Sequence, residues 1–288
     1  METFLEVCER MNFTHAGDAL GLTQPAVSRQ MKALETHYGV PLFDYAGKKL
    51  VLTAAGERLR RAARAMRADE ERLRCELKTH APRVLRLGCT PTPGQFLLPA
   101  RLADYLAAQP CTEVRMTVRN TARLLTLLDA GEIDFAVVEG NFPKHDYAHL
   151  LFSRQLFTPV CAPNSEITGN TLEALLGHTL VLREVGSGNR EILTHCLERE
   201  NRTVEDFAAR VEVDNVSAQK ALVRAGCGVA FLFGAAVEDE LRAGTLRTLA
   251  VEGFPVAHEI SFIWRRDSIF AAEYRALAVA LGAQASQS

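Results

Sequence analysis

A short loop at residues 186–190 gathers groups that could bind an anion. It reads Gly-Ser-Gly-Asn-Arg, and it joins the apolar, strand-like run 179–182 to a helix-like stretch that starts near Arg190. Backbone N–H groups at a helix start are unpaired and lie at the positive end of the helix dipole, so they favour an anion. Ser187 would add a hydroxyl, and Arg190 a charge. The alternative interpretation is a plain strand-to-helix turn, with Ser187 as N-cap and Arg190 exposed.

Other chemistries for this loop fail on spacing. The GxSxG pattern of a nucleophile elbow is absent because Val185, and not glycine, stands two residues before Ser187. The chain contains neither a GxGxxG pattern nor a Walker A loop. His145 and His149 lie four residues apart, but no helix and no third ligand accompany them, which favours a surface loop. The sequence therefore predicts no catalytic residues, no metal site and no cofactor.

Residues 13–38, FTHAGDALGLTQPAVSRQMKALETHY, have the pattern of a helix-turn-helix. A first helix would end near Leu20, the turn Gly-Leu-Thr follows, Thr23 can cap the second helix, and Pro25 fits its first turn. The core-facing positions of the second helix would be Val27, Met31 and Leu34. Its exposed residues would be Gln24, Ser28, Arg29 and Lys32. Such side chains can pair with adenine, guanine or phosphate, although an ordinary helical hairpin is the alternative.

Residues 57–79 contain neither Gly nor Pro and predict one long helix. Apolar residues repeat every seven positions, at Leu59, Met66 and Leu73, and the companion heptad positions hold Ala63, Glu70 and Leu77. Such a helix needs a partner, and a second copy of the chain is the simplest one; packing on its own chain is the alternative. Pro82 then makes residues 80–83 a predicted hinge.

From residue 84 onward the pattern becomes an alternation of strands and helices. Strands are predicted at 84–89, 114–118, 135–138, 179–182, 211–213 and 229–233. Helices are predicted at 96–108, 121–129, 190–200 and about 215–225, the second of them capped by Thr121. Such alternation over about 200 residues predicts an α/β domain with parallel sheets that helices cover.

The composition is that of a soluble globular protein, with 288 residues, 48% of them hydrophobic, and a formal net charge of −2. The charge is uneven, because residues 24–67 hold nine basic side chains and three acidic ones. This excess is either a footprint for a polyanion or a solvated helix face. No signal peptide and no run of about 18 apolar residues is visible. Seven cysteines without a CxxC pair predict reduced thiols and a cytoplasmic location.

The N-terminal stretch resembles the signature of LysR-type transcriptional regulators. The matched pieces, ALGLTQPAVSRQMKALE, GVPLF and LTAAG, occur in the order and spacing of that family. The resemblance implies a winged helix-turn-helix over residues 1–56, followed by a dimerising linker helix at 57–79. It also implies DNA contacts from Thr23, Gln24, Pro25, Ser28, Arg29 and Lys32, and wing contacts to phosphate from Lys48 and Lys49.

Three positions depart from the family pattern. Tyr45 stands where members often carry Arg, which puts a minor-groove contact of the wing in doubt. Asn12 and Gly17 replace the usual Ser and Ala near the first helix of the motif. Asn12 can still cap that helix, whereas Gly17 costs about 1 kcal/mol of helix propensity.

Segments after residue 84 resemble the family's effector domain, which has the two-lobed periplasmic-binding-protein fold. They are LRLGCT, LLDAGEIDFAVVEG, GSGNREIL and VRAGCGVAFLF. The implied effector domain covers 84–288, with lobe 1 at 84–161 and 266–288 and lobe 2 at 162–265.

An effector would bind between the lobes, near strand ends and helix starts. The residues expected there are Thr90, Thr92, Asn120, Thr121, Ser187, Asn189, Arg190, Asn215 and Phe231. The expected effector is a small anion, inorganic or carboxylate. Glu139 is odd beside an anion, so we interpret it as a cleft-lining or hinge residue.

The resemblance also implies an assembly. Two chains would pair through residues 57–79, and dimers would pair through effector domains into a homotetramer. This assembly would bind double-stranded promoter DNA, with RNA polymerase as a further candidate partner and no membrane contact. A regulator that senses redox through its cysteines is one alternative, although residues 186–190 contain no cysteine. A cytoplasmic solute-binding protein is an alternative of another class, and the helix-turn-helix argues against it.

Overall fold

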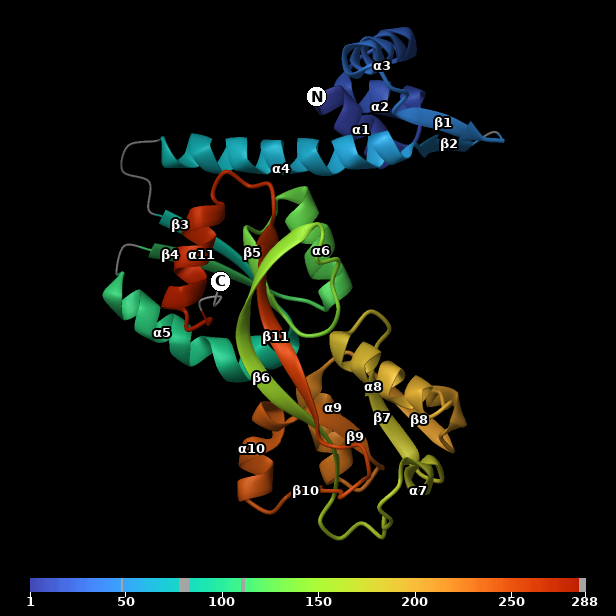
Figure 1. Cartoon of the computed structure of the whole chain (residues 1–288), viewed down its shortest axis with the longest axis vertical. Coiled ribbons are helices and arrows are strands. Elements are labelled where there is room, and N and C mark those ends of the chain that lie inside the picture. Colours follow the sequence, from blue (N-terminus) through green and yellow to red (C-terminus); the bar gives the residue numbers. More distant parts are fainter. Residues whose placement is uncertain (48, 78–82, 110–111, 285–288) are drawn as a thin grey trace. The chain divides into compact units, whose positions relative to one another are not determined.

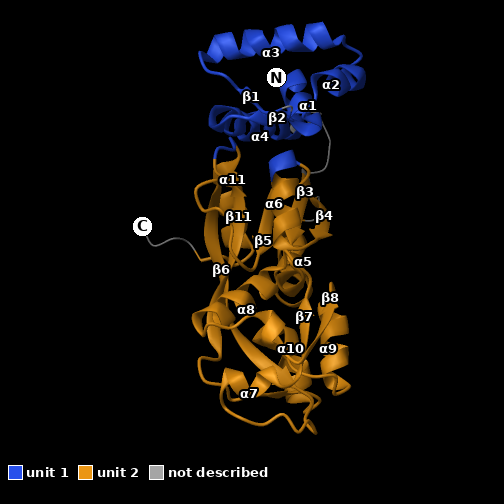
Figure 2. Ribbon diagram, turned by 90° about the vertical axis from the view of Figure 1, so that its right-hand side faces the viewer, with its two compact units in different colours: residues 1–79, 129–131, 267–269 blue, residues 80–128, 132–266, 270–288 orange. Residues whose placement is uncertain are grey.

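The computed structural model describes residues 1–47, 49–77, 83–109 and 112–284. The chain divides into two compact units (Figure 1, Figure 2). Unit 1 comprises residues 1–79 with the short segments 129–131 and 267–269, and unit 2 comprises the rest. Lys48 and the predicted hinge residues 80–82 lie outside the described residues. Within the described part of the chain, no helix combines the length and the apolar character that a bilayer crossing requires.

Unit 1 begins with three helices and a two-stranded ribbon. The helices are α1 (Glu2–Arg10), α2 (Phe13–Leu20) and α3 (Gln24–Tyr38), and the ribbon pairs β1 (Phe43–Ala46) with β2 (Lys49–Leu52) in antiparallel fashion. Apolar side chains from these helices and the ribbon share one core, in which Phe4, Ala16 and Val27 are fully buried. This arrangement confirms the predicted winged helix-turn-helix.

The two unusual residues of the motif have local structural reasons. Asn12 caps α2, because its Oδ1 accepts hydrogen bonds from the backbone N–H groups of Thr14 (2.8 Å) and His15 (3.1 Å). Gly17 packs directly on the turn, where an added Cβ would lie only 2.6 Å from the carbonyl oxygen of Leu22. The turn can therefore approach α2 closely only because residue 17 has no side chain.

Helix α4 runs from Ala54 to Glu76 and so begins three residues before the predicted position. Leu59 and Ala63 pack on the core of unit 1 itself, as the alternative interpretation of this helix supposed. Farther along, the apolar heptad residues are exposed, namely Met66, Leu73 and, just beyond the helix, Leu77. The first apolar residues of the predicted seam are therefore buried within the chain, and the later ones are exposed to solvent.

Lobe 1 of unit 2 is built on three parallel strands. They are β3 (Arg83–Cys89), β4 (Thr112–Val118) and β5 (Phe135–Val138), in the order β5-β3-β4. The helices of this lobe are α5 (Leu98–Ala108), which continues a π-helical turn at Pro93–Leu97, α6 (Thr121–Ala130) and α11 (Ala271–Ala280). All three predicted strands are present, and α5 begins two residues after its predicted start.

Two long antiparallel strands run through both lobes. They are β6 (Tyr147–Cys161) and β11 (Val256–Arg265), which pair with each other along ten residues of β11. β11 also pairs with β5 of lobe 1, whereas β6 pairs with β9 (Ala230–Phe233) and β10 (Arg247–Thr248) of lobe 2. The predicted parallel sheets are therefore only part of the architecture, because these strands add antiparallel pairings to it. These strands escaped prediction because polar residues such as His149, Arg154 and Gln155 interrupt their apolar pattern.

Lobe 2 pairs β7 (Thr179–Arg183) with β8 (Ala209–Val213) in parallel. Its helices are α7 (Leu172–Leu176), α8 (Gly188–Arg199), α9 (Val216–Arg224) and α10 (Gly234–Arg242), with one 3-10 turn at Val204–Asp206. Successive residues of β7 point alternately into two hydrophobic clusters. Leu180 and Leu182 pack with α8, whereas Val181 packs with α9 and α10.

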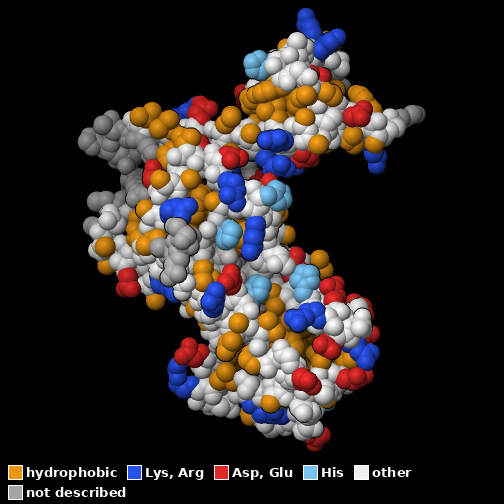
Figure 3. Space-filling model, viewed as in Figure 1, with side chains coloured by type: hydrophobic (Ala, Val, Ile, Leu, Met, Phe, Trp, Pro, Cys, Tyr) orange, Lys and Arg blue, Asp and Glu red, His pale blue; other side chains and the backbone are white. Residues whose placement is uncertain are grey.

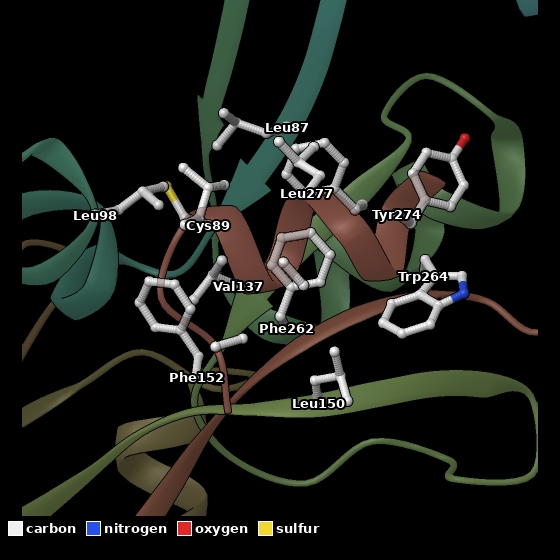
Figure 4. Close-up of a cluster of buried hydrophobic side chains, with 14 of the residues drawn as sticks. Leu87, Cys89, Leu98, Val137, Leu150, Phe152, Phe262, Trp264, Tyr274 and Leu277 are labelled. Atoms are coloured by element: carbon white, nitrogen blue, oxygen red, sulfur yellow. The ribbon is translucent and has the colours of Figure 1, made fainter. Parts of the chain in front are cut away.

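Strand β5 is covered by apolar side chains on both faces, and Figure 4 shows the cluster on one of them. Phe135 and Val137 of β5 point into the cluster that contains Phe262 and Leu277, while Ala136 and Val138 pack under α6 on the other face. A strand buried on both faces reads as a continuous apolar run, which is why β5 was predicted with its observed bounds. The residue that follows it, Glu139, is consequently carried into a buried position.

Candidate functional site

The exposed side of α3 carries the side chains expected to read DNA. Val27 and Met31 are buried and Leu34 packs beside them, so the core-facing register is confirmed. The opposite side leaves Thr23, Gln24, Pro25, Ser28, Arg29 and Lys32 exposed. Thr23 is the N-cap residue of α3, as expected, but its side chain makes no capping hydrogen bond, so its hydroxyl is available to another partner. The first turns of α3 thus present hydroxyl, amide and guanidinium groups together.

The ribbon places further polar groups near the start of α3. Lys49 is exposed opposite Ala46, at the end of the ribbon where Gly47 adopts a φ of 66°. Tyr45, 61% exposed, and Gln24 line one surface hollow of about 390 Å³. The second wing lysine, Lys48, lies outside the described residues.

The carboxyl end of β5 is tied to two threonines of lobe 1. The backbone N–H of Glu139 donates to Thr90 Oγ1 (3.2 Å), and the Thr121 hydroxyl donates to the carbonyl oxygen of Glu139 (2.7 Å). Thr121 is therefore not the cap of α6; Asn120 is, because its Oδ1 accepts from the N–H of Arg123 (3.0 Å). Thr90 and Thr121 are both buried, so their main observed role is to hold residue 139 in place.

Both lobes meet at this strand end, where the start of α8 approaches β5 and α6 (Figure 1). A Cβ on Gly188 would lie 2.3 Å from the carbonyl oxygen of Glu139, and a Cβ on Gly140 would lie 2.6 Å from Cα of Gly188. The two backbones can therefore touch only because both residues are glycine. Across the same boundary, Asn120 Nδ2 donates to Glu184 Oε1 (3.3 Å).

Arg183 is the buried cation of the interlobe region, and it was not among the residues predicted from the sequence. It ends β7 and is 1% exposed. Its Nε and Nη2 donate to the carboxylate of Glu184 (2.9 and 3.2 Å), and Nη2 also donates to the carbonyl oxygen of Asp214 (3.0 Å). Nη1 has no hydrogen-bond partner among the described residues. The signal was a charged residue at the end of the apolar run TLVL, just before the glycine loop.

Three of the expected effector residues surround this region in buried positions. Thr92, Ser187 and Asn189 are each at most 3% exposed. Ser187 is the N-cap residue of α8, as the alternative interpretation supposed, but its side chain makes no capping hydrogen bond. Asn189 Nδ2 is buried without a partner among the described residues. Asn189 Nδ2 and Arg183 Nη1 are thus two buried donors near the start of α8 that have no hydrogen-bond partner among the described residues.

Three other expected residues are used elsewhere. Arg190 Nη1 donates to the carbonyl oxygen of Arg183 (3.1 Å) and to the carboxylate of Glu212, so its charge is already paired. Asn215 is exposed and caps α9 by accepting from the N–H of Ala218 (3.0 Å). Phe231 lies in the core of lobe 2, with its ring centroid 4.9 Å from that of Phe254. The sequence located the strand ends and helix starts but could not tell which side chains were already paired.

Glu139 is the second ionisable group of the interlobe region. Its side chain is 1% exposed, and neither carboxyl oxygen has a hydrogen-bond partner of ordinary geometry within the described residues, although the Thr92 hydroxyl lies near enough to act on the carboxyl. Burial raises the pKa of Glu139 to about 7, because desolvation outweighs the favourable effects of the Thr92 hydroxyl and the Arg183 charge; Glu184 adds to the rise. Arg183 and Glu139 therefore influence each other without forming an ion pair.

The cysteines of the region are not poised for redox chemistry. Cys89, which ends β3, is fully buried, and burial raises the pKa of its thiol to about 12. A thiol with such a pKa stays protonated at neutral pH and is a poor nucleophile. Cys196 lies on α8 and is half-buried, and burial also raises its pKa.

A surface hollow of about 560 Å³ lies elsewhere on lobe 2, lined by Glu173, Cys196, Arg202 and Phe254 among others. The charges on its wall are at least partly paired, since Arg202 contacts Glu173 at 2.6 Å. On the face of lobe 2 seen in Figure 3, acidic and basic side chains are interspersed. This hollow offers no concentration of one charge, in contrast to the unsatisfied donors at the start of α8.

A winged helix-turn-helix joined to a two-lobed α/β sensor domain defines a ligand-responsive transcriptional regulator. The chain matches the bacterial regulatory helix-turn-helix protein, lysR family, over residues 1–57, and the LysR substrate binding domain over residues 78–285. The protein therefore belongs to the LysR family of transcriptional regulators. Members of this family bind DNA and small-molecule effectors and form oligomers.

Known proteins similar to this chain include two regulators that match it over most of their own length. The uncharacterized HTH-type transcriptional regulator YeiE of Escherichia coli (strain K12) is 31% identical over 92% of this chain and 89% of its own. The HTH-type transcriptional regulator CbbR of Rhodospirillum rubrum is 30% identical over 90% of this chain and 87% of its own. Full-length LysG of Corynebacterium glutamicum has the same fold, with a TM-score of 0.67 at 20% identity, covering 97% of this chain and 95% of its own.

Proposed function

We propose that this LysR-family regulator binds promoter DNA through α3 and the ribbon, and that a small acidic effector held between the lobes controls its action. The DNA half of the proposal is supported by one observation above all. Six polar or turn-forming residues at the start of α3 are exposed on the side opposite its buried register. A helix that presents such groups at its N-terminal end can enter the major groove and read base edges there.

Arg29 provides the test of this DNA contact. Its Nε makes only one weak intrahelical hydrogen bond, to the carbonyl oxygen of Pro25 at 3.4 Å, so the guanidinium can turn towards a guanine. We expect Arg29→Ala to weaken operator binding by about 1–3 kcal/mol, measured by gel-shift titration at constant salt. Arg242→Ala, an exposed arginine of α10 in unit 2, should leave binding unchanged. Equal affinities for the wild type and Arg29→Ala would refute the contact.

The effector half is supported by the two unsatisfied donors, Arg183 Nη1 and Asn189 Nδ2, beside the first turn of α8. Buried donors without partners are costly, and a ligand oxygen would relieve that cost. The amides at the start of α8 add the positive end of a twelve-residue helix. These donors fit an acidic group of an effector. Arg183 and Asn189 would therefore bind the anion that Arg190 was first expected to bind.

Asn189 tests this half of the proposal, because removing an unpartnered amide costs the folded protein no hydrogen bond. We expect Asn189→Ala to keep the melting temperature of the wild type but to weaken binding of small carboxylates roughly tenfold. The measurement is thermal stabilisation by a panel of carboxylates and sulfate at rising concentration. Asn141→Ala, an exposed asparagine at the lobe boundary, is the matched control. Undiminished stabilisation of Asn189→Ala would remove Asn189 from the site.

The working assembly in this proposal is a dimer formed through the exposed part of α4, and a homotetramer formed through effector domains. It acts in the cytoplasm on promoter DNA, with RNA polymerase as a further partner. The support for α4 is its exposed apolar residues, since Met66 and Leu73 lie seven positions apart on one face and are 62% and 41% exposed. Effector binding would act by favouring one arrangement of the two lobes over another.

A further inference from the structure

The interlobe region contains a buried carboxyl that a simple anion cannot satisfy. Neither carboxyl oxygen of Glu139 has a hydrogen-bond partner of ordinary geometry among the described residues, and the nearby Thr92 hydroxyl offsets only part of the cost of burial. The same region holds Glu184, whose carboxylate is occupied by Arg183 and by Asn120 Nδ2. An effector that carried only negative charge would therefore lie beside the unpaired Nη1 of Arg183 but also beside two acidic side chains.

Arg183 and Glu139 lie close enough to interact electrostatically but do not contact each other. The positive charge of Arg183 favours ionisation of Glu139, yet the two side chains form no ion pair in the structure. Each is at most 1% exposed. Buried charges are normally paired or hydrogen-bonded. Arg183 is paired with Glu184 but keeps its Nη1 without a partner, and both carboxyl oxygens of Glu139 lack a hydrogen-bond partner among the described residues.

From these observations we infer that the effector is a small acid that also carries a hydrogen-bond donor, either a hydroxyl or an ammonium group. Its acidic oxygens contact Arg183 Nη1 and Asn189 Nδ2, and its donor contacts the carboxyl of Glu139. Thr90 and Thr121 hold the backbone of residue 139 at 3.2 and 2.7 Å, so the carboxyl is presented from a rigid strand end. This inference rests on the proposed effector site and specifies its ligand class.

The high pKa of Glu139 agrees with this assignment. A carboxyl whose pKa is about 7 is partly protonated at neutral pH while the site is empty. An ammonium group beside it would favour the ionised form, and a hydroxyl would donate to it. The other charged groups that act on it are Arg183, which lowers its pKa, and Glu184, which raises it.

The test uses full-length protein and matched sets of small acids that differ in one group. The sets are propionate, lactate and alanine, and succinate, malate and aspartate, with sulfate added as an inorganic anion. We measure stabilisation against thermal unfolding at several concentrations for the wild type, Glu139→Gln and Glu139→Met. Glu132→Gln, an exposed glutamate just before β5, is the control.

We expect donor-bearing members of a set to bind the wild type at least roughly tenfold more tightly than the donor-free member. Glu139→Met removes both oxygens and should abolish that preference, whereas Glu132→Gln should retain it. Glu139→Gln separates the two sources of the donor, because an amide oxygen still accepts from a hydroxyl but no longer offers a charge to an ammonium group. Glu139→Gln should therefore keep binding the hydroxy acid and lose binding of the amino acid.

Two results would overturn the inference, and only the second would also overturn the proposed effector site. If propionate, succinate or sulfate binds as tightly as the donor-bearing acids, or if Glu139→Met keeps the preference, the donor requirement is wrong and the proposed anion site stands. If no acid of either kind stabilises the wild type, the inference and the proposed effector site both fail.

Discussion

At the scale of single residues, Glu139 gives the protein a titration that can be measured without knowledge of the effector. Its pKa is raised from 4.5 to about 7 by burial, so the folded chain binds this proton more tightly than the unfolded chain does. The stability contribution of the group is therefore fully present below about pH 4.5 and is lost as the pH rises through about 7. Each tenfold change in proton affinity is worth about 1.4 kcal/mol, so the loss is on the order of 3–4 kcal/mol.

We expect Glu139→Gln to become more stable relative to the wild type as the pH rises from about 5 to 8, because the amide has no charge to desolvate. The measurement is chemical denaturation of both proteins at each pH. Glu132→Gln, whose side chain is exposed, should show a difference that does not change with pH. A pH-independent difference for Glu139→Gln as well would mean that residue 139 does not titrate in this range.

The same scale explains why some candidate residues could be found in the sequence and others could not. Thr90, Ser187 and Asn189 stand at strand ends and helix starts, which hydrophobic periodicity locates. Arg190 stands there too, but Glu212 on the neighbouring strand β8 engages it, and a contact between residues 22 positions apart leaves no local signal. Arg183 was missed for the converse reason, since its burial depends on the packing of lobe 2 around β7.

At the scale of elements, the turn between α2 and α3 depends on Asn12 and Gly17. Asn12 supplies the N-terminal hydrogen bonds of α2, and Gly17 lets the turn pack against the helix. The sequence-based expectation that Gly17 only costs helix propensity is therefore incomplete. The close approach of Leu22 at that position requires glycine, although helix formation alone would favour alanine.

We expect Asn12→Ala to destabilise unit 1 by about 0.5–2 kcal/mol, because two backbone N–H groups of α2 lose their acceptor. Chemical denaturation monitored by circular dichroism measures the change. Asn12→Ser keeps a capping oxygen and should stay within a few tenths of a kcal/mol of the wild type. If alanine and serine behaved alike, the cap would contribute nothing to stability.

At the scale of the whole molecule, α4 begins in the core of unit 1 and ends in a stretch with exposed apolar side chains. Its first turns pack on the winged helix-turn-helix through Leu59 and Ala63, and its later turns expose Met66 and Leu73. A second copy of the same helix could cover these residues in the manner of a coiled coil. Helix α4 would then connect the winged helix-turn-helix, and with it α3, to the dimer interface.

We expect Leu73→Glu to weaken dimer formation at least roughly tenfold, because a charge would replace an apolar residue of the proposed seam. Sedimentation velocity over a range of protein concentrations measures the change. Glu71→Lys reverses a charge on the same helix outside the seam, and its sedimentation should match that of the wild type. A dimer that survives Leu73→Glu unchanged would place the interface elsewhere.

The sequence by itself determined the local features of this protein. The helix-turn-helix follows from a short turn and a helical spacing of apolar residues, and the register that buries Val27 and Met31 was predicted correctly. Strand β5 was predicted with its observed bounds because a strand buried on both faces is apolar throughout. These features leave a pattern in residues that are close in sequence, which is why they could be predicted without the fold.

Only the tertiary structure decided what lies between the lobes. Strands β6 and β11 join the two lobes by antiparallel pairing between segments about a hundred residues apart, which no local pattern records. The same folding brings Glu139 from the end of β5 near Arg183 from the end of β7. Whether a side chain is paired or free depends on its neighbours in space. The expected anion loop was therefore found in sequence, and its buried cation and carboxyl only in the structure.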